Sequence, residues 1–189
     1  MSSNASCVGK PPLVFIGLDD VGKSGETGKV CVEAARELSK RGYGKISVYS
    51  VDLVNPRLLE KDCKNIAWAL AVEADPGLVL SVVGELAVEK SSSESNPGAA
   101  VLLDSPPAAE LVALAERITK ERVTREEVYR AAEAYNVELW ELGGDGAGVV
   151  GAFAAAVLAS ARRAREVPLP FNSGRVAHTS GADEVNSFT

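Results

Sequence analysis

The chain has 189 residues, of which 46% are hydrophobic and 24% charged, the balance of an ordinary globular protein with one full domain or two small ones. Its formal net charge of −6 disfavours a protein that binds nucleic acid by itself, because duplex binding depends on a basic surface. Three scattered cysteines and a single histidine argue against a zinc site. Residues 1–10 are polar and no apolar stretch is long enough to span a bilayer, so we expect no membrane partner and a cytoplasmic location.

After a flexible leader at 1–11, the first part of the chain predicts strands and helices in βαββαβ order. Apolar or alternating runs indicate the strands, and apolar residues on one face indicate the helices. Asp75 followed by Pro76 is typical of a helix start. We expect strands at 13–18, 45–54, 66–73 and 99–104, and helices at 30–39 and 77–89. This order matches the split βαβ unit of ferredoxin-like folds.

The second part predicts an α-α-β-α appendage. Ser105 and Pro106 begin one helix, and Thr124 with Glu127 forms a capping box that opens another. A strand at 137–142, a small-residue helix at 149–165 and a polar tail at 166–189 complete the chain. The fold class is therefore α/β of the α+β kind, folded over residues 12–165, a region that can divide into two small subdomains near residue 104.

A glycine-rich turn follows two adjacent acids at the end of the first strand. Asp19 and Asp20 stand at the strand end, and Gly22, Gly25 and Gly28 precede the helix. Backbone amides freed by glycines converge on phosphates, a helix N-terminus adds partial positive charge, and carboxylates hold magnesium. We therefore expect nucleotide chemistry here, with both acids as Mg²⁺ ligands. The alternative is that the acids serve only a turn or a helix cap.

Residues 17–24, GLDDVGKS, also satisfy the P-loop pattern G-x-x-x-x-G-K-[ST], in which Lys23 would be the phosphate-binding lysine. Two carboxylates inside a phosphate cradle would repel the triphosphate. Gly25 and Gly28 also delay the helix beyond the Gly-Lys-Ser. A P-loop NTPase is therefore the weaker alternative.

A second glycine turn precedes the last expected helix. Residues 146–151, GAGVVG, match G-x-G-x-x-G, but the strand and the acid that a dinucleotide fold needs do not follow. Gly144, Gly146 and Gly148 lie ahead of a helix N-terminus that can bind an anion. Glycines that serve close helix packing are an equally good explanation.

Taken together, several stretches resemble one protein family. They are FIGLDD with the glycine turn after it, NPRLLEKDCKN, SNPGAAVLL and GAGVVGAFAAA. In this order they resemble the kinase-like and ferredoxin-like domains in the N-terminal half of the archaeal tRNA-isoleucine agmatidine synthetase family, TiaS. The family's corresponding elements are an IGIDDTDS strand and loop, a PRL segment that runs into KTRGN, an NPG turn and a G-x-G-x-x-G-A helix start. The resemblance covers about residues 13–160.

The resemblance implies an ATP- and Mg²⁺-dependent activity, since family members use ATP to activate a cytidine carbonyl that agmatine then attacks. It places Asp19 and Asp20 beside Mg²⁺, and it matches Lys61 and Asn65 to the ends of the KTRGN element. Asp19, Asp20 and Lys61 are therefore the expected catalytic residues. The expected nucleotide-binding residues are Gly22, Lys23, Gly25, Thr27, Gly28, Asn65, Asn96, Gly98, Gly144, Gly146 and Gly148.

Two positions depart from the family pattern: Gly22 stands where the family has a further aspartate, and Cys63 where it has an arginine. The OB-fold and zinc-ribbon domains that hold tRNA have no counterpart in this sequence, so direct tRNA binding is not expected. The leading hypothesis is an ATP-dependent, kinase-like enzyme that acts on a small molecule or on RNA supplied by a protein partner. The alternatives are a non-catalytic nucleotide-binding paralogue or scaffold subunit and, third, the P-loop NTPase.

Overall fold

A six-stranded antiparallel sheet carries the fold, seen in a computed structural model that describes residues 10–22, 25–53, 65–103 and 106–171. The strands lie in the order β5-β4-β1-β3-β2-β6, and each pairs antiparallel with its neighbours. Their bounds are Leu13–Asp19 for β1, Ile46–Leu53 for β2, Asn65–Glu73 for β3, Gly98–Leu103 for β4, Glu138–Glu141 for β5 and Arg165–Val167 for β6. The α+β class expected from the sequence is confirmed.

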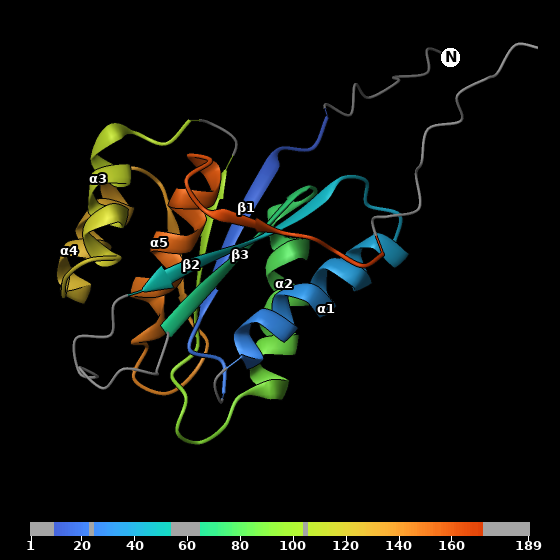
Figure 1. The fold of residues 1–189 in the computed structure, drawn as a ribbon, viewed down its shortest axis with the longest axis horizontal. Helices are drawn as coiled ribbons and strands as arrows, with labels where there is room; N and C mark the ends of the chain where they lie inside the picture. Colours follow the sequence, from blue (N-terminus) through green and yellow to red (C-terminus); the bar gives the residue numbers. More distant parts are fainter. Residues whose placement is uncertain (1–9, 23–24, 54–64, 104–105, 172–189) are drawn as a thin grey trace, which may run out of the picture.

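Helices cover both faces of this sheet (Figure 1). α1 (Glu26–Lys40) and α2 (Pro76–Lys90) pack on one face, while α3 (Ala109–Ile118), α4 (Arg125–Ala134) and α5 (Gly148–Ser160) pack on the other. The four strands in the order β4-β1-β3-β2, together with α1 and α2, form the expected ferredoxin-like βαββαβ unit. The helices α3 and α4, strand β5 and helix α5 form the expected appendage.

The alternation of side chains along β1 divides the core into two halves. Val14, Ile16 and Leu18 belong to the cluster under α1 and α2, while Phe15 belongs to the cluster under α5. Successive residues of a strand point to opposite faces, so one buried strand serves both layers. This explains why residues 13–18 are apolar without interruption.

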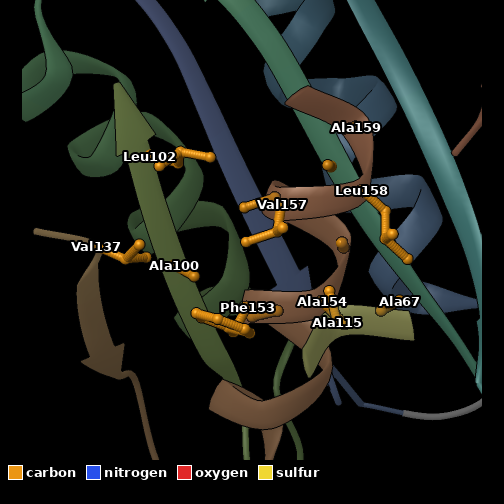
Figure 2. Close-up of a cluster of buried hydrophobic side chains, with 14 of the residues drawn as sticks. Ala67, Ala100, Leu102, Ala115, Val137, Phe153, Ala154, Val157, Leu158 and Ala159 are labelled. Atoms are coloured by element: carbon orange, nitrogen blue, oxygen red, sulfur yellow. The ribbon is translucent and has the colours of Figure 1, made fainter. Parts of the chain in front are cut away.

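Helix α5 lies unusually close to the sheet because small residues meet there. A Cβ at Gly17 would overlap the carbonyl oxygen of Ala152, and a Cβ at Gly98 would overlap the backbone nitrogen of Val149. Figure 2 shows Phe153 and Val157 on the side of α5 turned to β4, the strand that carries Ala100. Full burial of a side chain such as Phe153 stabilises the fold by about 2 kcal/mol.

Three helix boundaries differ from the sequence prediction. α3 begins at Ala109 and not at Ser105 and Pro106, and no side chain caps its start. α1 begins at Glu26, before the expected residue 30, so Thr27 and Gly28 lie in its first turn. α5 ends at Ser160, before the expected residue 165, where the Arg163 amide donates to the carbonyl of Leu158 at 2.7 Å. This 6→1 bond is a Schellman ending, a geometry that helical periodicity does not reveal.

The expected polar tail begins too early, because residues 166–171 belong to the fold. Glu166 and Val167 lie in β6, which pairs with β2, and Leu169 is buried. Phe171 lies 5.8 Å below the guanidinium of Arg36 on α1. A three-residue strand is too short to show alternation in the sequence. Residues 1–9 of the leader and 172–189 of the tail lie outside the described residues.

The division expected near residue 104 stays a prediction, although β5 pairs with β4 and continues the sheet beyond that point. Among the described residues, none of the helices combines the length and hydrophobicity needed to cross a bilayer. Cys31 is buried in α1, and this burial raises the pKa of its thiol to about 12.

Candidate functional site

Several elements end or begin at one end of the sheet. β1 ends at Asp19, which pairs with Gly98 at the start of β4. α5 begins at Gly148, whose backbone amide donates to the carbonyl of Asn96 at 3.0 Å. Acids, an amide side chain and a glycine-rich helix start, which are far apart in the chain, are thus brought together. We call this group of residues, Asp19, Asp20, Asn96 and 144–148, the strand-end site.

Asp19 is a buried carboxylate, with only 5% of the residue exposed. It points toward α5, because a Cβ added at Gly151 would overlap its Oδ2. Burial raises the pKa of Asp19 to about 7, a hydrogen bond from the Asp20 amide lowers it in part, and the nearby charge of Asp20 raises it. Asp19 therefore holds its proton over much of the range in which an exposed aspartate is ionised.

Asp20 follows in a left-handed backbone conformation, with φ of 56°. Its Oδ2 accepts the backbone amide of Asn96 at 3.0 Å and the side-chain amide of the same residue at 3.3 Å. Aspartate tolerates positive φ better than most residues, but the conformation still costs free energy. The two bonds from Asn96 hold the carboxylate in place in return.

Asn96 links Asp20 to the second glycine turn. Its Oδ1 accepts the Asp145 amide at 2.9 Å, and its backbone carbonyl accepts the Gly148 amide. Side chain and backbone together therefore connect the loop before β4, the acid after β1 and the start of α5. Gly144 is required at this place because a Cβ there would overlap the Asn96 side chain.

The second glycine turn directs several of its amides inward. The amide of Ala147 donates to Asp145 Oδ1 at 2.9 Å, and that of Val149 donates to the carbonyl of Gly146 at 3.2 Å. A bound anion would have to use other amides of the turn or replace these bonds. The positions of Gly98, Gly148 and Gly151 match the packing explanation, because a Cβ on any of them would meet backbone or carboxylate atoms.

Helix α4 holds the second glycine turn from outside. Arg125 donates to the carbonyl of Asp145, and Tyr129 donates its hydroxyl to Glu141 Oε1 at 2.6 Å. Gly146 lies against the same glutamate, since a Cβ there would be 2.5 Å from its Cδ. The contacts of Arg125, Tyr129 and Glu141 were not predicted from the sequence.

The first glycine turn is shaped by packing as well as by backbone conformation. Val21 is buried, and its amide donates to the hydroxyl of Thr27 at 3.1 Å, so this threonine closes the turn. A Cβ at Gly22 would be 2.9 Å from the carbonyl oxygen of Lys90 at the end of α2. Gly28 lies against the indole of Trp68, because a Cβ added at this glycine would be 2.5 Å from the ring atoms.

Of the other expected residues, Asn65 and Gly25 are exposed. Asn65 is exposed as the first residue of β3, where it pairs with Leu53. Lys23 and Lys61 lie outside the described residues, as does Cys63. Gly25 caps α1 with φ of 88° and no neighbour within 4 Å of an added Cβ. The roles assigned to these residues stay predictions.

Asp19 and Asp20 can supply only part of the ligand shell of Mg²⁺. In the part of the chain that the structure describes, no group of three or more His, Cys, Asp or Glu side chains could hold a metal ion. Mg²⁺ is commonly bound through one or two carboxylates while phosphates and water complete its shell. Asp19 and Asp20 match that donor set if a nucleotide supplies the remaining oxygens.

Comparison with known proteins points to one kind of enzyme. No family model and no curated protein sequence matches the chain significantly. Among solved structures, the chain is similar to the complex of TiaS with an isoleucine tRNA and ATP, with a TM-score of 0.64 and 26% identity over 77% of this chain and 36% of that one. The complex of TiaS with the same tRNA, AMPCPP and agmatine gives the same values. Apo TiaS, an agmatidine synthetase for this isoleucine tRNA, gives a TM-score of 0.63.

The structural resemblance to TiaS expected from the sequence motifs is therefore present. This chain spans about a third of the length of those proteins, 36% in the ATP complex. The similarity covers 77% of this chain.

Proposed function

We propose that this protein is an ATP-dependent enzyme with phosphotransferase- or ligase-like chemistry, and that the strand-end site binds the nucleotide phosphates. The observation that carries the proposal is the buried Asp19 beside an Asp20 that Asn96 holds, at the start of the glycine-rich α5. The structural similarity to TiaS, whose complexes contain ATP and AMPCPP, supports it.

In this proposal Asp19 and Asp20 hold Mg²⁺, which would neutralise charge on the phosphates. Asn96 positions Asp20, and Gly148 and Gly151 leave room for Asp19 under α5. Lys23 and Lys61 are proposed to offset charge that develops on the transferred phosphoryl group. Of the remaining expected binding residues, Gly22, Gly25, Thr27 and Gly144 shape the two turns, and Asn65 at the start of β3 is proposed to contact the nucleotide.

The buried carboxyl of Asp19 adds a proton-dependent element to cation binding. Because its pKa is raised to about 7 by burial, a cation must displace a proton from this group near neutral pH. Binding of Mg²⁺ with ATP should therefore release protons and strengthen as the pH rises from 6 to 8. The acceptor is proposed to be a small molecule, or RNA that a protein partner supplies.

The test is calorimetric titration of ATP with and without Mg²⁺, on the wild-type chain and on Asp20→Ala. We expect Mg²⁺-dependent binding that Asp20→Ala weakens by at least tenfold, because this change removes one ligand and frees Asn96. Asp52→Asn, at an exposed aspartate of β2, is the matched control and should leave the affinity unchanged. The proposal would be contradicted if wild type bound ATP equally well with and without Mg²⁺ and if both variants kept the wild-type affinity.

A non-catalytic nucleotide-binding paralogue is the second candidate, and Gly22 favours it. This residue has φ of 64° and lies against the Lys90 carbonyl, so the backbone has no room for the further aspartate that the family carries there. Mg²⁺-dependent binding of ATP without any release of ADP or phosphate, across a panel of acceptors, would favour this candidate.

The P-loop alternative is tested by Lys23→Ala. A P-loop predicts that this change abolishes nucleotide binding, while the strand-end site predicts a milder effect. The helix start at Glu26, after Gly25, favours the strand-end site, because a P-loop helix opens at the Gly-Lys-Ser itself.

A further inference from the structure

A groove beside α1, on the face of the sheet away from α5, has no role in the strand-end site. Its volume is about 450 Å³, within the range of small-molecule pockets. It is lined by Gly25, Gly28, Lys29, Val32, Glu33, Arg36 and Trp68. We call it the Trp68 groove.

Trp68 is the aromatic surface of this groove. On β3 it pairs with Leu18 of β1 and Ser50 of β2, and its indole is only partly buried. Gly28 brings the backbone of α1 onto the six-membered ring, because any side chain at that position would meet the ring atoms. The indole is thus held by a helix while part of its surface stays open to the groove.

The charges around the groove are balanced, with two cations and two acids. Lys29 and Arg36 contribute two cations, and Glu33 contributes one acid among the lining residues. Lys29 also pairs with Glu26, but its side chain remains 72% exposed and able to turn toward a ligand. Together with Glu33, the Glu26 carboxylate that pairs with Lys29 matches these two cations in charge.

We propose that the Trp68 groove binds the base of a free nucleotide, stacked on the indole. Every nucleobase offers a π-face, and stacking on an aromatic side chain contributes about 1–3 kcal/mol per base. Lys29 and Arg36 border the same groove. The proposal rests on the proposed function, because it assigns the base of the same ATP whose phosphates are placed at the strand-end site.

The distance between the two places is compatible with a single nucleotide. Leu18, the partner of Trp68, directly precedes Asp19. Strand spacing and rise put the Cα atoms of Trp68 and Asp19 about 6 Å apart. Their side chains face opposite layers, so the ligand would cross the end of β1 beside Gly25, which borders the groove and caps α1.

The experiment uses the fluorescence of Trp68 in the full chain. The sequence has two tryptophans, so Trp140→Phe leaves Trp68 as the only reporter. Trp140 is 45% exposed on β5 and does not border the groove, which makes its replacement a matched control for stability. We expect ATP and AMP to quench Trp68 fluorescence and shift its maximum, and tripolyphosphate to leave both unchanged.

Affinity measurements on variants give a second reading. Trp68→Leu should weaken ATP binding about tenfold, which corresponds to the loss of one stacked base. Trp140→Leu should leave the affinity unchanged. Gly28→Ala, whose Cβ displaces the indole, should weaken ATP binding and shift the Trp68 emission without ligand. If Trp68→Leu does not fold, the quenching of the Trp140→Phe protein decides alone.

The outcomes separate this proposal from the proposed function. Mg²⁺-dependent ATP binding without a fluorescence change, and with full affinity in Trp68→Leu, overturns the groove and leaves the strand-end site intact. Quenching by AMP without any Mg²⁺-dependent ATP binding supports the groove and overturns the proposed function. Quenching by a short single-stranded RNA but not by mononucleotides overturns the free-nucleotide proposal in favour of an RNA contact.

Discussion

The two glycine-rich turns of this protein look alike in sequence, but their glycines differ in the atoms that surround them. In the turn before α1, Gly22 and Gly25 adopt positive φ, and an added Cβ at Gly25 meets no neighbour. In the turn before α5, Gly148 and the nearby Gly151 face backbone and carboxylate atoms at contact distance. Both turns use glycine for backbone freedom, since Gly144 and Gly146 also adopt positive φ, but Gly148 and Gly151 in addition bring α5 onto the backbone and the carboxyl group of Asp19.

The comparison shows that a glycine motif alone does not predict which ligand binds, or whether one binds. Both turns precede a helix N-terminus, the usual place for phosphate. In the second turn, however, acceptors inside the chain already take the amides of Asp145, Ala147 and Gly148. Asp19 lies where the two regions meet, because it ends β1 before the first turn and packs under the helix that the second turn opens.

The largest expected effect concerns this meeting point. The pKa of Asp19 is 3.8 in its ordinary state and about 7 in the fold, because burial disfavours the charged form. Between these values the folded state keeps a proton that the unfolded state has released, so stability falls as the pH rises through this window. The full difference amounts to about 4 kcal/mol. Asp19→Asn should therefore match wild type near pH 4 and exceed its free energy of unfolding by up to about 4 kcal/mol at pH 8.

Urea unfolding at both pH values, with EDTA present, measures this difference. Asp52→Asn, at an exposed aspartate, should change the free energy by less than about 0.5 kcal/mol at either pH. If Asp19→Asn changed the free energy of unfolding by the same amount at pH 4 and pH 8, the pKa of Asp19 would not be raised in the folded state. Added Mg²⁺ with ATP should reduce the advantage of the variant if the carboxylate binds the cation.

The second prediction tests the packing role of the small residues. Gly98→Ala places a methyl group into the backbone of α5, so α5 or the sheet must move. We expect a loss of about 3 kcal/mol in the free energy of unfolding, at the upper end of overpacking costs. Gly44→Ala is the control, because an added Cβ there meets nothing within 4 Å. Thermal melts that put the two variants within 1 °C of each other would refute close packing of α5.

The third prediction tests the connection between the two turns. Asn96→Ala removes the side-chain bonds to Asp20 and Asp145, which should cost about 2 kcal/mol. It should also speed hydrogen exchange at the amides of Asp145 and Gly148. Asn65→Ala removes the same side chain from an exposed position of β3 and should cost less than about 0.5 kcal/mol. Equal exchange rates in the two variants would mean that Asn96 does not hold the second turn.

The smallest expected effect belongs to the first turn. Gly25→Ala meets no steric obstacle, so only the positive φ opposes it, at a cost of about 1 kcal/mol. Gly25→Asn should cost less than Gly25→Ala, because asparagine tolerates the left-handed region. Chemical denaturation of both variants checks this order. An alanine variant as stable as wild type would show that the turn relaxes to negative φ.

Much of the fold followed from local patterns. The apolar strands, the helix cap at Asp75 and the capping box of Thr124 with Glu127 all occur where the sequence places them. The order βαββαβ was sufficient to predict the ferredoxin-like unit. The start of α1 was not predictable, because its N-cap is Gly25 and not a residue with a capping side chain. Strand β6 was not predictable, because three residues are too few to show alternation.

The position of the two acids was predictable from the sequence, but the contacts that surround them were not. Asp19 and Asp20 are adjacent in the chain, and their position at the strand end is confirmed. That Asn96 holds Asp20, and that Arg125 and Tyr129 hold the second turn, depends on contacts between segments far apart in sequence. The same holds for Trp68, whose open groove exists only because Gly28 of α1 lies on its indole.

The sequence by itself determined the types and order of the elements from β1 to α5, the acidic strand end and the two glycine-rich turns, because these depend on periodicity and on residues close in the chain. The tertiary structure alone decided that Asp19 is buried and Asn65 exposed, and which glycines serve packing. Burial and contact depend on which faces of distant segments meet. Local patterns predict that a helix or strand has an apolar face, but only the tertiary structure shows which segment packs against that face.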